Sequence, residues 1–262
     1  MESDPHVWIA ALRRSHDRLV SLIRPLDASA VRGPSYCRDW TIAQVMSHLG
    51  SGAEIALMML PVALGEAEPL GAGAFQPVWD VWNGKSPDDQ VADALQADEK
   101  HVLALEQLSD AQLAGVNFPF LGLELDAAGL VRLRLGEHAL HSWDVAVTAD
   151  PAAAVAPDAA ELLVDNVAAF IAPRLGKPQG EELRYRIITT GPDRDYLLTV
   201  TDAVAMTAWP GGAGGQSARQ VSMPAEALLR LSYGRLDAGH TPAQVSGDPA
   251  DLDRLRAVFP GF

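Results

Sequence analysis

The spacing of apolar residues changes about halfway along the chain, and this change limits which folds are possible. Up to about residue 148, apolar residues recur every three to four positions in four segments, as on one face of an α-helix. Between residues 183 and 201 they alternate with polar residues, as on a strand with one buried side. A helical first half followed by a half that contains strands predicts two domains of different architecture.

Local start signals indicate where the four helices begin. Asp4, Ser86 and Asp126 each place a side-chain oxygen where it can accept a hydrogen bond from the first turn. Thr41 and Gln44 have the spacing of a capping box, and the flanking residues Trp40 and Val45 have the spacing of a hydrophobic staple. We therefore expect a four-helix bundle with helices over about 4–26, 41–64, 86–105 and 126–148.

An alanine- and proline-rich stretch, residues 149–157, is typical of a linker between domains. Beyond it, the pattern predicts a short helix over about 162–171 and further elements over 183–190, 196–201, 204–209, 224–233 and from 249 onward. The glycine-rich run 210–215 lacks the Lys-Ser/Thr of a phosphate-binding loop and is expected to be a turn. The predicted fold class is mixed: a four-helix bundle over residues 1–150, then a small α+β domain over residues 151–262.

The charge balance excludes several partners. The 20 Lys and Arg residues against 34 Asp and Glu residues give a net charge of −14, which opposes binding to nucleic acid or to an anionic membrane surface. The longest apolar stretch, residues 55–64, is too short to span a bilayer, and the acidic N-terminus does not resemble a secretory signal. Cys37 is the one cysteine, so no intrachain disulfide can form. We expect a soluble, cytoplasmic protein; the sequence predicts no oligomeric state.

Polar residues interrupt two helix faces that would otherwise be apolar. Glu137 and His141 are four residues apart and project from one face of the predicted helix 126–148. His48 shares a face with Val45 and Leu49 on the predicted helix 41–64, so all three polar groups are expected to point inward. A buried unpaired carboxylate is costly unless a cation or a hydrogen bond compensates for it. A divalent metal ion would compensate for the whole group.

The spacing alone leaves simpler interpretations open. A Glu-x-x-x-His pair is also typical of an exposed ion pair, and an inward histidine is often bonded to a backbone carbonyl. Asp144 lies one turn beyond His141 and could hydrogen-bond a ligand imidazole. His138 points about 100° away from Glu137 around the helix and is not expected to be a ligand.

Two segments resemble the signatures of a known family. The run 40–49 (WTIAQVMSHL) and the run 137–144 (EHALHSWD) are similar to those of the DinB-like metal-dependent superfamily. More specifically, they resemble the mycothiol-dependent maleylpyruvate isomerase family. The segments 228–235 and 247–262 resemble that family's small C-terminal domain, which is similar to sterol-carrier-type folds.

This resemblance implies a set of functional residues. His48, Glu137 and His141 would bind zinc or another divalent metal, and an arginine of the small domain would act at the active site. Arg235 matches that arginine best, with Arg230 as the alternative. The implied activity is that of a thiol-dependent metalloenzyme, in which a zinc-activated thiolate of mycothiol adds to a conjugated, carboxylate-bearing electrophile.

Two other functions remain compatible with the sequence. A mycothiol S-transferase, for detoxification or natural-product biosynthesis, needs the same activated thiolate as an isomerase. A non-catalytic protein that binds a small apolar ligand would need neither metal nor thiol.

Overall fold

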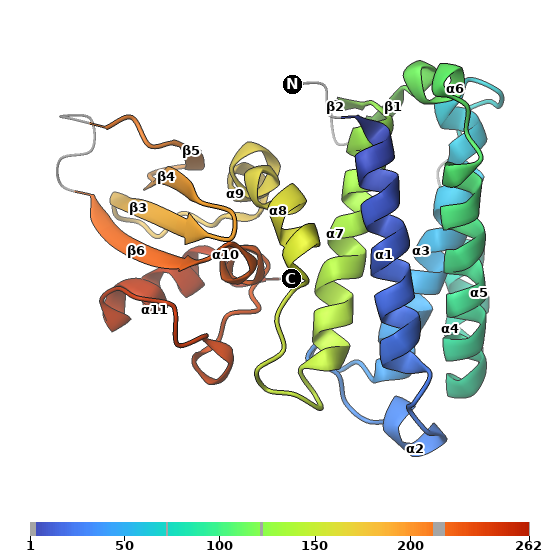
Figure 1. The fold of residues 1–262 in the computed structure, drawn as a ribbon, viewed down its shortest axis with the longest axis horizontal. Helices are drawn as coiled ribbons and strands as arrows, with labels where there is room; N and C mark the ends of the chain where they lie inside the picture. Colours follow the sequence, from blue (N-terminus) through green and yellow to red (C-terminus); the bar gives the residue numbers. More distant parts are fainter. Residues whose placement is uncertain (1–3, 72, 121–122, 212–217, 262) are drawn as a thin grey trace. The chain divides into compact units, whose positions relative to one another are not determined.

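The structure is a computed structural model that describes residues 4–71, 73–120, 123–211 and 218–261. It divides into two compact units, Met1–Asp150 and Pro151–Phe262, which Figure 1 shows in sequence colours. The expected turn over 210–215 lies partly outside the described residues, as does the C-terminal Phe262.

The first unit is the helical bundle that the sequence predicts. Among its described residues, four helices of 19 to 22 residues form the bundle: α1 (Pro5–Ile23), α3 (Ile42–Ala63), α5 (Pro87–Glu106) and α7 (Ala127–Ala146). Helices α1 and α3 each pack against both α5 and α7.

The connections of the bundle contain short elements that the sequence analysis did not predict. These are α2 (Ala28–Val31), α4 (Gln76–Asn83), α6 (Asp110–Gly115) and the hairpin of β1 (Phe118–Phe120) with β2 (Leu123–Leu125). Each has at most eight residues, which is too short for an apolar period to be recognised.

The predicted start signals cap the helices. The Gln44 backbone N–H donates to Thr41 Oγ1 at 3.2 Å, and the Thr41 N–H donates to Gln44 Oε1 at 2.8 Å, which completes the capping box. Asp4, Ser86 and Asp126 accept hydrogen bonds from the first turns of α1, α5 and α7. The N-terminal ends of all four bundle helices are therefore fixed by local sequence.

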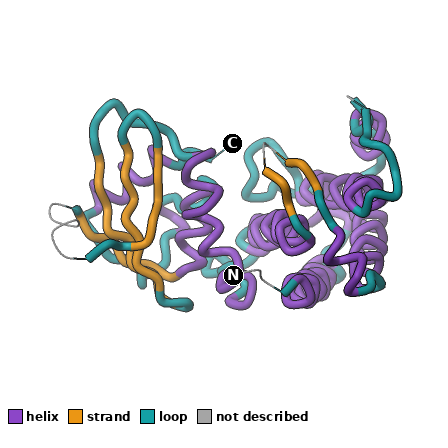
Figure 2. Tube along the Cα trace, turned by 90° about the horizontal axis from the view of Figure 1, so that it is seen from above, coloured by secondary structure: helices purple, strands orange, loops and turns teal. Residues whose placement is uncertain are grey.

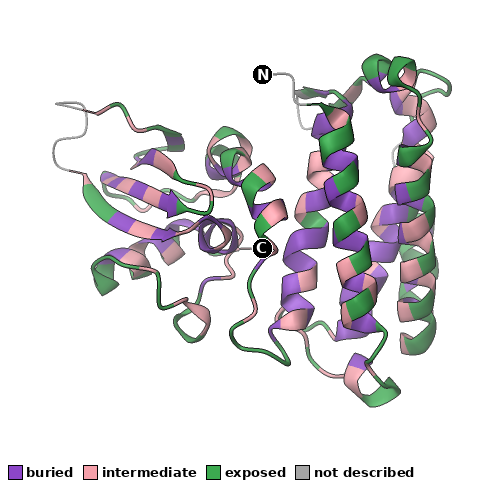
Figure 3. Ribbon diagram, in the orientation of Figure 1, coloured by how far each residue is buried: buried purple, intermediate pink, exposed green. Residues whose placement is uncertain are grey.

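Helix α3 supplies much of the bundle core. Its length and apolarity would suffice to cross a membrane, but Val45, Met46 and Leu49 are buried against the other helices. They form one cluster with Ile23 of α1 and Trp82 of α4. Figure 3 shows the buried residues along the inward faces of the bundle helices.

The second unit combines one sheet with helices. It opens with α8 (Pro157–Asn166), a π-helical turn (Val167–Ile171) and α9 (Ala172–Leu175). The sheet contains β3 (Leu183–Thr190), β4 (Arg194–Val200), β5 (Val204–Ala208) and β6 (Arg219–Pro224), and α10 (Ala225–Ser232) and α11 (Pro249–Val258) follow.

The second unit has the predicted α+β class, and its sheet is mixed. Its strand order is β5-β4-β3-β6, in which β3 pairs antiparallel with β4 and parallel with β6. Figure 2 shows these strands as one layer beside helices of the same unit. The alternation predicted for β3 buries Leu183, Tyr185 and Ile187. Strand β6 was not predicted, because its short alternating segment directly follows the glycine-rich run.

Gly50 allows α3 to approach its neighbours closely. A Cβ atom at this position would overlap the ring of Trp82 on α4 and would lie 2.9 Å from the Cα atom of Ala94 on α5. Glycine inside a helix costs about 1 kcal/mol relative to alanine. This cost is offset by the close packing of three helices beside His48.

We predict that Gly50→Ala destabilises the protein, although alanine is the better helix former. Overpacking of a filled core costs about 1–3 kcal/mol. Gly115→Ala is the matched control, because a Cβ there meets no atom within 4 Å. Urea unfolding should give a lower midpoint for Gly50→Ala than for either the wild type or Gly115→Ala. Equal midpoints would show that Gly50 is not needed for this packing.

Candidate metal centre

Helices α3 and α7 bring the three predicted ligands together. His48 lies on α3, and Glu137 and His141 lie one turn apart on α7. Their ligand atoms are all within 4.8 Å of one another. Glu137 Oε2 is 2.9 Å from His48 Nε2 and 3.5 Å from His141 Nε2. Two imidazoles and one carboxylate thus converge from two facing helices, as in other metal sites of helix bundles.

The expectation that all three groups point into the core is wrong for two of them. The side chains of His48 and Glu137 are 40% and 48% exposed, whereas that of His141 is 11% exposed. The buried face of α7 instead contains Leu135 and His138. Helix α7 carries apolar residues on more than one face, so its apolar pattern did not identify the core-facing side. The three groups are therefore partly open to solvent.

Asp144 fixes the orientation of the His141 ring by a hydrogen bond at Nδ1. Its Oδ2 atom lies 2.8 Å from His141 Nδ1, and its side chain is fully buried. A carboxylate at Nδ1 places the proton of a neutral imidazole on that nitrogen and leaves Nε2 as the metal-binding atom. The hydrogen bond expected from the spacing of Asp144 and His141 is therefore present.

Cys37 also lies beside His141, although its position just before the predicted helix 41–64 favoured a lone buried thiol over a neighbour of the site. Its Sγ atom is 3.0 Å from Asp144 Oδ2 and 3.8 Å from His141 Nδ1. Cys37, His141 and Asp144 are thus a second group of potential ligands. This group meets His141 at Nδ1, where Asp144 is already bonded, whereas Glu137, the partner of His48, meets it at Nε2. The Nε2 group is the better candidate for a metal centre.

Trp40 is a further neighbour that the sequence analysis assigned only to helix capping. Its ring centroid is 5.4 Å from that of His48 and 6.4 Å from that of His141. The residue is 38% exposed, which is unusual for tryptophan at the start of a core helix. Its indole ring therefore lies next to both imidazoles.

His138 lies outside the ligand cluster, as its angular position on the helix predicts. It is fully buried, and its Nε2 atom is 2.7 Å from Asp98 Oδ1.

The two arginines considered for the active site belong to the second unit. Arg230 is buried, and its guanidinium donates to both carboxylate oxygens of Glu226 at 2.7 and 2.9 Å and to the carbonyl of His240. Arg235 is partly exposed, and it donates to the carbonyl of Tyr233 at 3.1 Å. Most donors of Arg230 are therefore engaged within its own unit.

Hydrogen bonds within the ligand cluster determine which of its groups are charged. Partial burial would raise the pKa of Glu137, but hydrogen bonds from His141 and His48 outweigh it and lower that pKa well below its usual range. Burial would lower the pKa of His141, but hydrogen bonds with Asp144, Cys37 and Glu137 outweigh it and raise that pKa to about 10. Without a metal ion, the cluster therefore holds a carboxylate and an imidazolium at neutral pH.

The donor set fits a divalent ion such as zinc. Zinc is bound by histidine nitrogens and carboxylate oxygens at about 2.0–2.1 Å, so tetrahedral ligand atoms lie about 3.3 Å apart. The distances of 2.9 and 3.5 Å from Glu137 Oε2 to the two Nε2 atoms are close to this value. Three protein ligands leave one position open, as in catalytic zinc sites.

The fold and this site together define a two-domain protein with a candidate two-histidine, one-glutamate metal centre in its helical bundle. The family model of the mycothiol maleylpyruvate isomerase N-terminal domain matches residues 12–146, and that of the MDMPI C-terminal domain matches residues 158–254. The chain belongs to the mycothiol-dependent maleylpyruvate isomerase family, as the sequence signatures indicated.

Solved structures agree with this fold. A crystal structure of the mycothiol-dependent maleylpyruvate isomerase aligns with a TM-score of 0.66 over 94% of each chain at 17% identity. A histidine-to-alanine mutant of that enzyme aligns with a TM-score of 0.61 over 89% of this chain and 90% of the other, at 16% identity. At these identities the likeness concerns the fold alone.

The curated relatives include an uncharacterized protein of Mycobacterium tuberculosis. It is 29% identical over 147 residues, which is 55% of this chain and 57% of that relative. The match therefore spans little more than half the length of either protein.

We predict that zinc binding releases about one proton per ion at neutral pH. His141, with its pKa raised to about 10, is protonated in the metal-free protein, and a metal ligand must be the neutral imidazole. Apparent zinc affinity should therefore rise about tenfold per pH unit from pH 7 to pH 9 and level off above the pKa of His141.

Titration calorimetry in two buffers of different ionisation enthalpy measures this proton count. Asp144→Asn is the informative variant, because it removes a hydrogen bond that raises the pKa of His141. Fewer protons should be released in this variant at pH 7. Zinc binding without proton release in the wild type would contradict the assignment of His141 as a protonated ligand.

Proposed function

We propose that this chain is a metal-dependent enzyme that uses a low-molecular-weight thiol, mycothiol, to act on an electrophile that carries a conjugated alkene and a carboxylate. The observation that supports this most directly is the partly exposed cluster of His48, Glu137 and His141 in a chain of this family. The low-molecular-weight thiol and the presence of Cys37 as the one cysteine both suit a reducing environment, so we propose a cytoplasmic location.

His48, Glu137 and His141 would hold zinc or another divalent ion in this enzyme. When bound, the metal supplies a positive charge that lowers the pKa of a thiol, so that thiolate forms at neutral pH. Asp144 keeps the His141 ring in the orientation that points Nε2 toward Glu137. Because His48 and Glu137 are partly exposed, a cosubstrate could reach an ion held by these residues from solvent.

Two residues outside the ligand set would act on the substrate. Trp40 presents an exposed ring beside both imidazoles and would limit the approach of water. Arg235 would bind the substrate carboxylate and stabilise the enolate-like charge that develops on addition. We assign this role to Arg235 rather than Arg230, because Glu226 and the His240 carbonyl already engage the Arg230 guanidinium.

An isomerase and an S-transferase share the first step of this chemistry. The thiolate sulfur bonds to one alkene carbon, and the electron pair of the double bond moves into the conjugated carbonyl group as an enolate, which leaves a single bond that can rotate. In an isomerase, the enolate electrons re-form the double bond, the C–S bond breaks, and the thiolate and a trans alkene are released. In a transferase, the enolate carbon instead takes up a proton from solvent, and the C–S bond persists in the product.

A thiol balance distinguishes the two activities. Isomerisation of maleylpyruvate by a catalytic amount of mycothiol, with the thiol recovered, would establish an isomerase. Loss of one thiol per product molecule would establish a transferase. The family assignment favours the isomerase.

We predict that the protein, purified without a metal-affinity step, contains close to one zinc ion per chain. His48→Ala, Glu137→Gln and His141→Ala each remove one of three ligands and should bring the zinc content close to zero. His6→Ala is the matched control, because His6 is an exposed histidine that pairs with Asp110. Mass spectrometric metal analysis gives the result. A wild-type protein that takes up no zinc on addition would contradict the proposal.

We predict that Arg235→Gln lowers turnover of a carboxylate substrate without changing zinc content. Loss of one charge-assisted hydrogen bond costs about 1.5–3 kcal/mol, or about 10- to 100-fold in kcat/KM. Arg254→Gln in the same unit is the control, because Arg254 is a partly exposed arginine that pairs with Asp251. Equal kcat/KM values for the two variants would remove Arg235 from the active site.

A further inference from the structure

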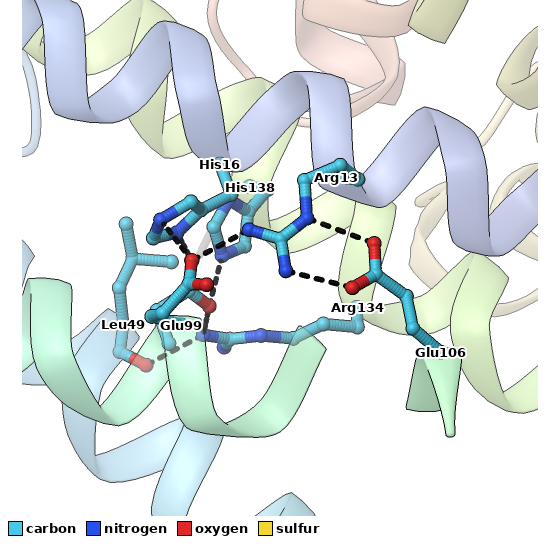
Figure 4. Close-up of polar contacts among 8 residues, drawn as sticks. Arg13, His16, Leu49, Glu99, Glu106, Arg134 and His138 are labelled. Carbon is cyan, nitrogen blue, oxygen red and sulfur yellow. Dashed lines mark hydrogen bonds and ion pairs between the residues drawn. The ribbon is translucent and has the colours of Figure 1, made fainter. Parts of the chain in front are cut away.

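A second cluster of polar side chains lies inside the helical bundle, on a different side of α7 from the metal centre. Asp98 of α5 is 1% exposed and accepts three hydrogen bonds. The donors are His16 Nδ1 of α1 at 2.6 Å, and His138 Nε2 and an Arg134 terminal nitrogen of α7 at 2.7 and 2.9 Å. Figure 4 shows His16, His138 and Arg134 converging from these helices.

Arg134 extends this cluster to the fourth helix of the bundle. The guanidinium nitrogen that donates to Asp98 also donates to the backbone carbonyl of Leu49 on α3 at 2.7 Å. Gly52 leaves room for it, because a Cβ atom there would lie 2.9 Å from the other terminal nitrogen of Arg134. One carboxylate and one guanidinium therefore connect α1, α3, α5 and α7.

The contacts of this cluster are adjacent in sequence to two predicted metal ligands. Leu49 directly follows His48 on α3, and His138 directly follows Glu137 on α7. Neighbouring side chains of an α-helix point about 100° apart, so Glu137 and His138 occupy adjoining faces of α7 at the same height. On α3, the contact is to the backbone carbonyl of Leu49, one residue after His48. A shift of α3 along or around α7 would disturb both sets of contacts together.

Asp98 remains ionised near neutral pH. Burial alone would raise the pKa of Asp98, but the charges and hydrogen bonds of His138, His16 and Arg134 outweigh it and lower that pKa well below its usual range. Burial and the charge of Arg134 lower the pKa of the neighbouring His101 to about 3. The Asp98–Arg134 ion pair thus persists throughout the neutral range.

This arrangement is not the one that stability alone would favour. Arg134 Nε, His101 Nδ1 and His138 Nδ1 are buried without a hydrogen-bond partner among the described residues. Buried polar atoms without partners lower stability, and apolar residues often replace a buried ion pair without loss. The cluster therefore has a cost in stability that a positioning role would explain.

We propose that Asp98, through Arg134 and His138, is a positioning residue for the metal centre. It fixes α3 relative to α7 at the separation at which His48, Glu137 and His141 can bind one ion. This inference rests on the proposed function, because it requires that these three residues bind a metal.

Three variants separate positioning from stability. Asp98→Asn leaves Arg134 as a buried cation without its counter-ion and should lower both the Tm and the zinc affinity. Asp98→Asn combined with Arg134→Met removes both charges, so the Tm should recover while zinc affinity stays at least about tenfold below the wild type. Gly52→Ala leaves both charges in place but displaces the guanidinium, and it should also weaken zinc binding about tenfold.

Zinc affinity is measured by competition with a chromophoric chelator, at a temperature well below the Tm of every variant. Glu106→Gln is the matched control, because it breaks an ion pair with Arg13 between α1 and α5 and leaves Asp98 untouched. Its zinc affinity should equal that of the wild type.

The outcomes distinguish this inference from the proposed function. If the wild type binds zinc, and Gly52→Ala and the double variant bind it equally tightly, Asp98 serves stability alone and the inference is wrong. If the wild type binds no zinc, the proposed function fails, and the inference fails with it. Weaker zinc binding in both variants, with the Tm of the double variant restored, supports positioning.

Discussion

Metal ligands on separate helices require those helices to keep a fixed separation, because each ligand atom of a zinc ion must lie about 2.0–2.1 Å from it. Here His48 comes from α3, whereas Glu137 and His141 come from α7. The residues that follow His48 and Glu137 are both tied to the Asp98–Arg134 ion pair. Buried contacts inside the bundle thus position α3 and α7, while the side chains of His48 and Glu137 remain partly exposed to solvent.

Close packing acts on the same part of α3. Gly50, two residues after His48, allows Trp82 and α5 to approach the helix, and Gly52 leaves space for Arg134. Both glycines weaken the helix locally, yet the capping box of Thr41 and Gln44 fixes its start at Ile42. The capping box and the tertiary contacts therefore compensate for the loss of helix stability that Gly50 and Gly52 cause.

The sequence was sufficient to predict the bundle, its helix starts and the proximity of Glu137 to His141, because these depend on contacts within one helix. His48 was grouped with them because it shares the apolar face of the predicted helix 41–64, and the family signature then supported all three as one ligand set. Trp40 was missed as a neighbour of the site, and for Cys37 a lone buried thiol was preferred, because both residues precede α3 and meet His141 through tertiary packing alone. The exposure of Glu137 was also mispredicted, since apolar residues cover more than one face of α7. The short connecting elements and β6 lack a long enough apolar period to be recognised.

The position of Cys37 bears on why an enzyme with its own thiol would need a separate thiol cosubstrate. Cys37 Sγ lies on the Nδ1 side of the His141 ring, 3.8 Å from that nitrogen, and donates to Asp144. Glu137, which also contacts His48, meets the ring at its other nitrogen, Nε2. An ion held by Nε2 is therefore separated from Cys37 by the imidazole itself. In the proposed enzyme, the open coordination position is consequently left to a thiol that arrives from solvent, where His48 and Glu137 are exposed. Cys37 instead strengthens the hydrogen-bonded support of His141 through Asp144.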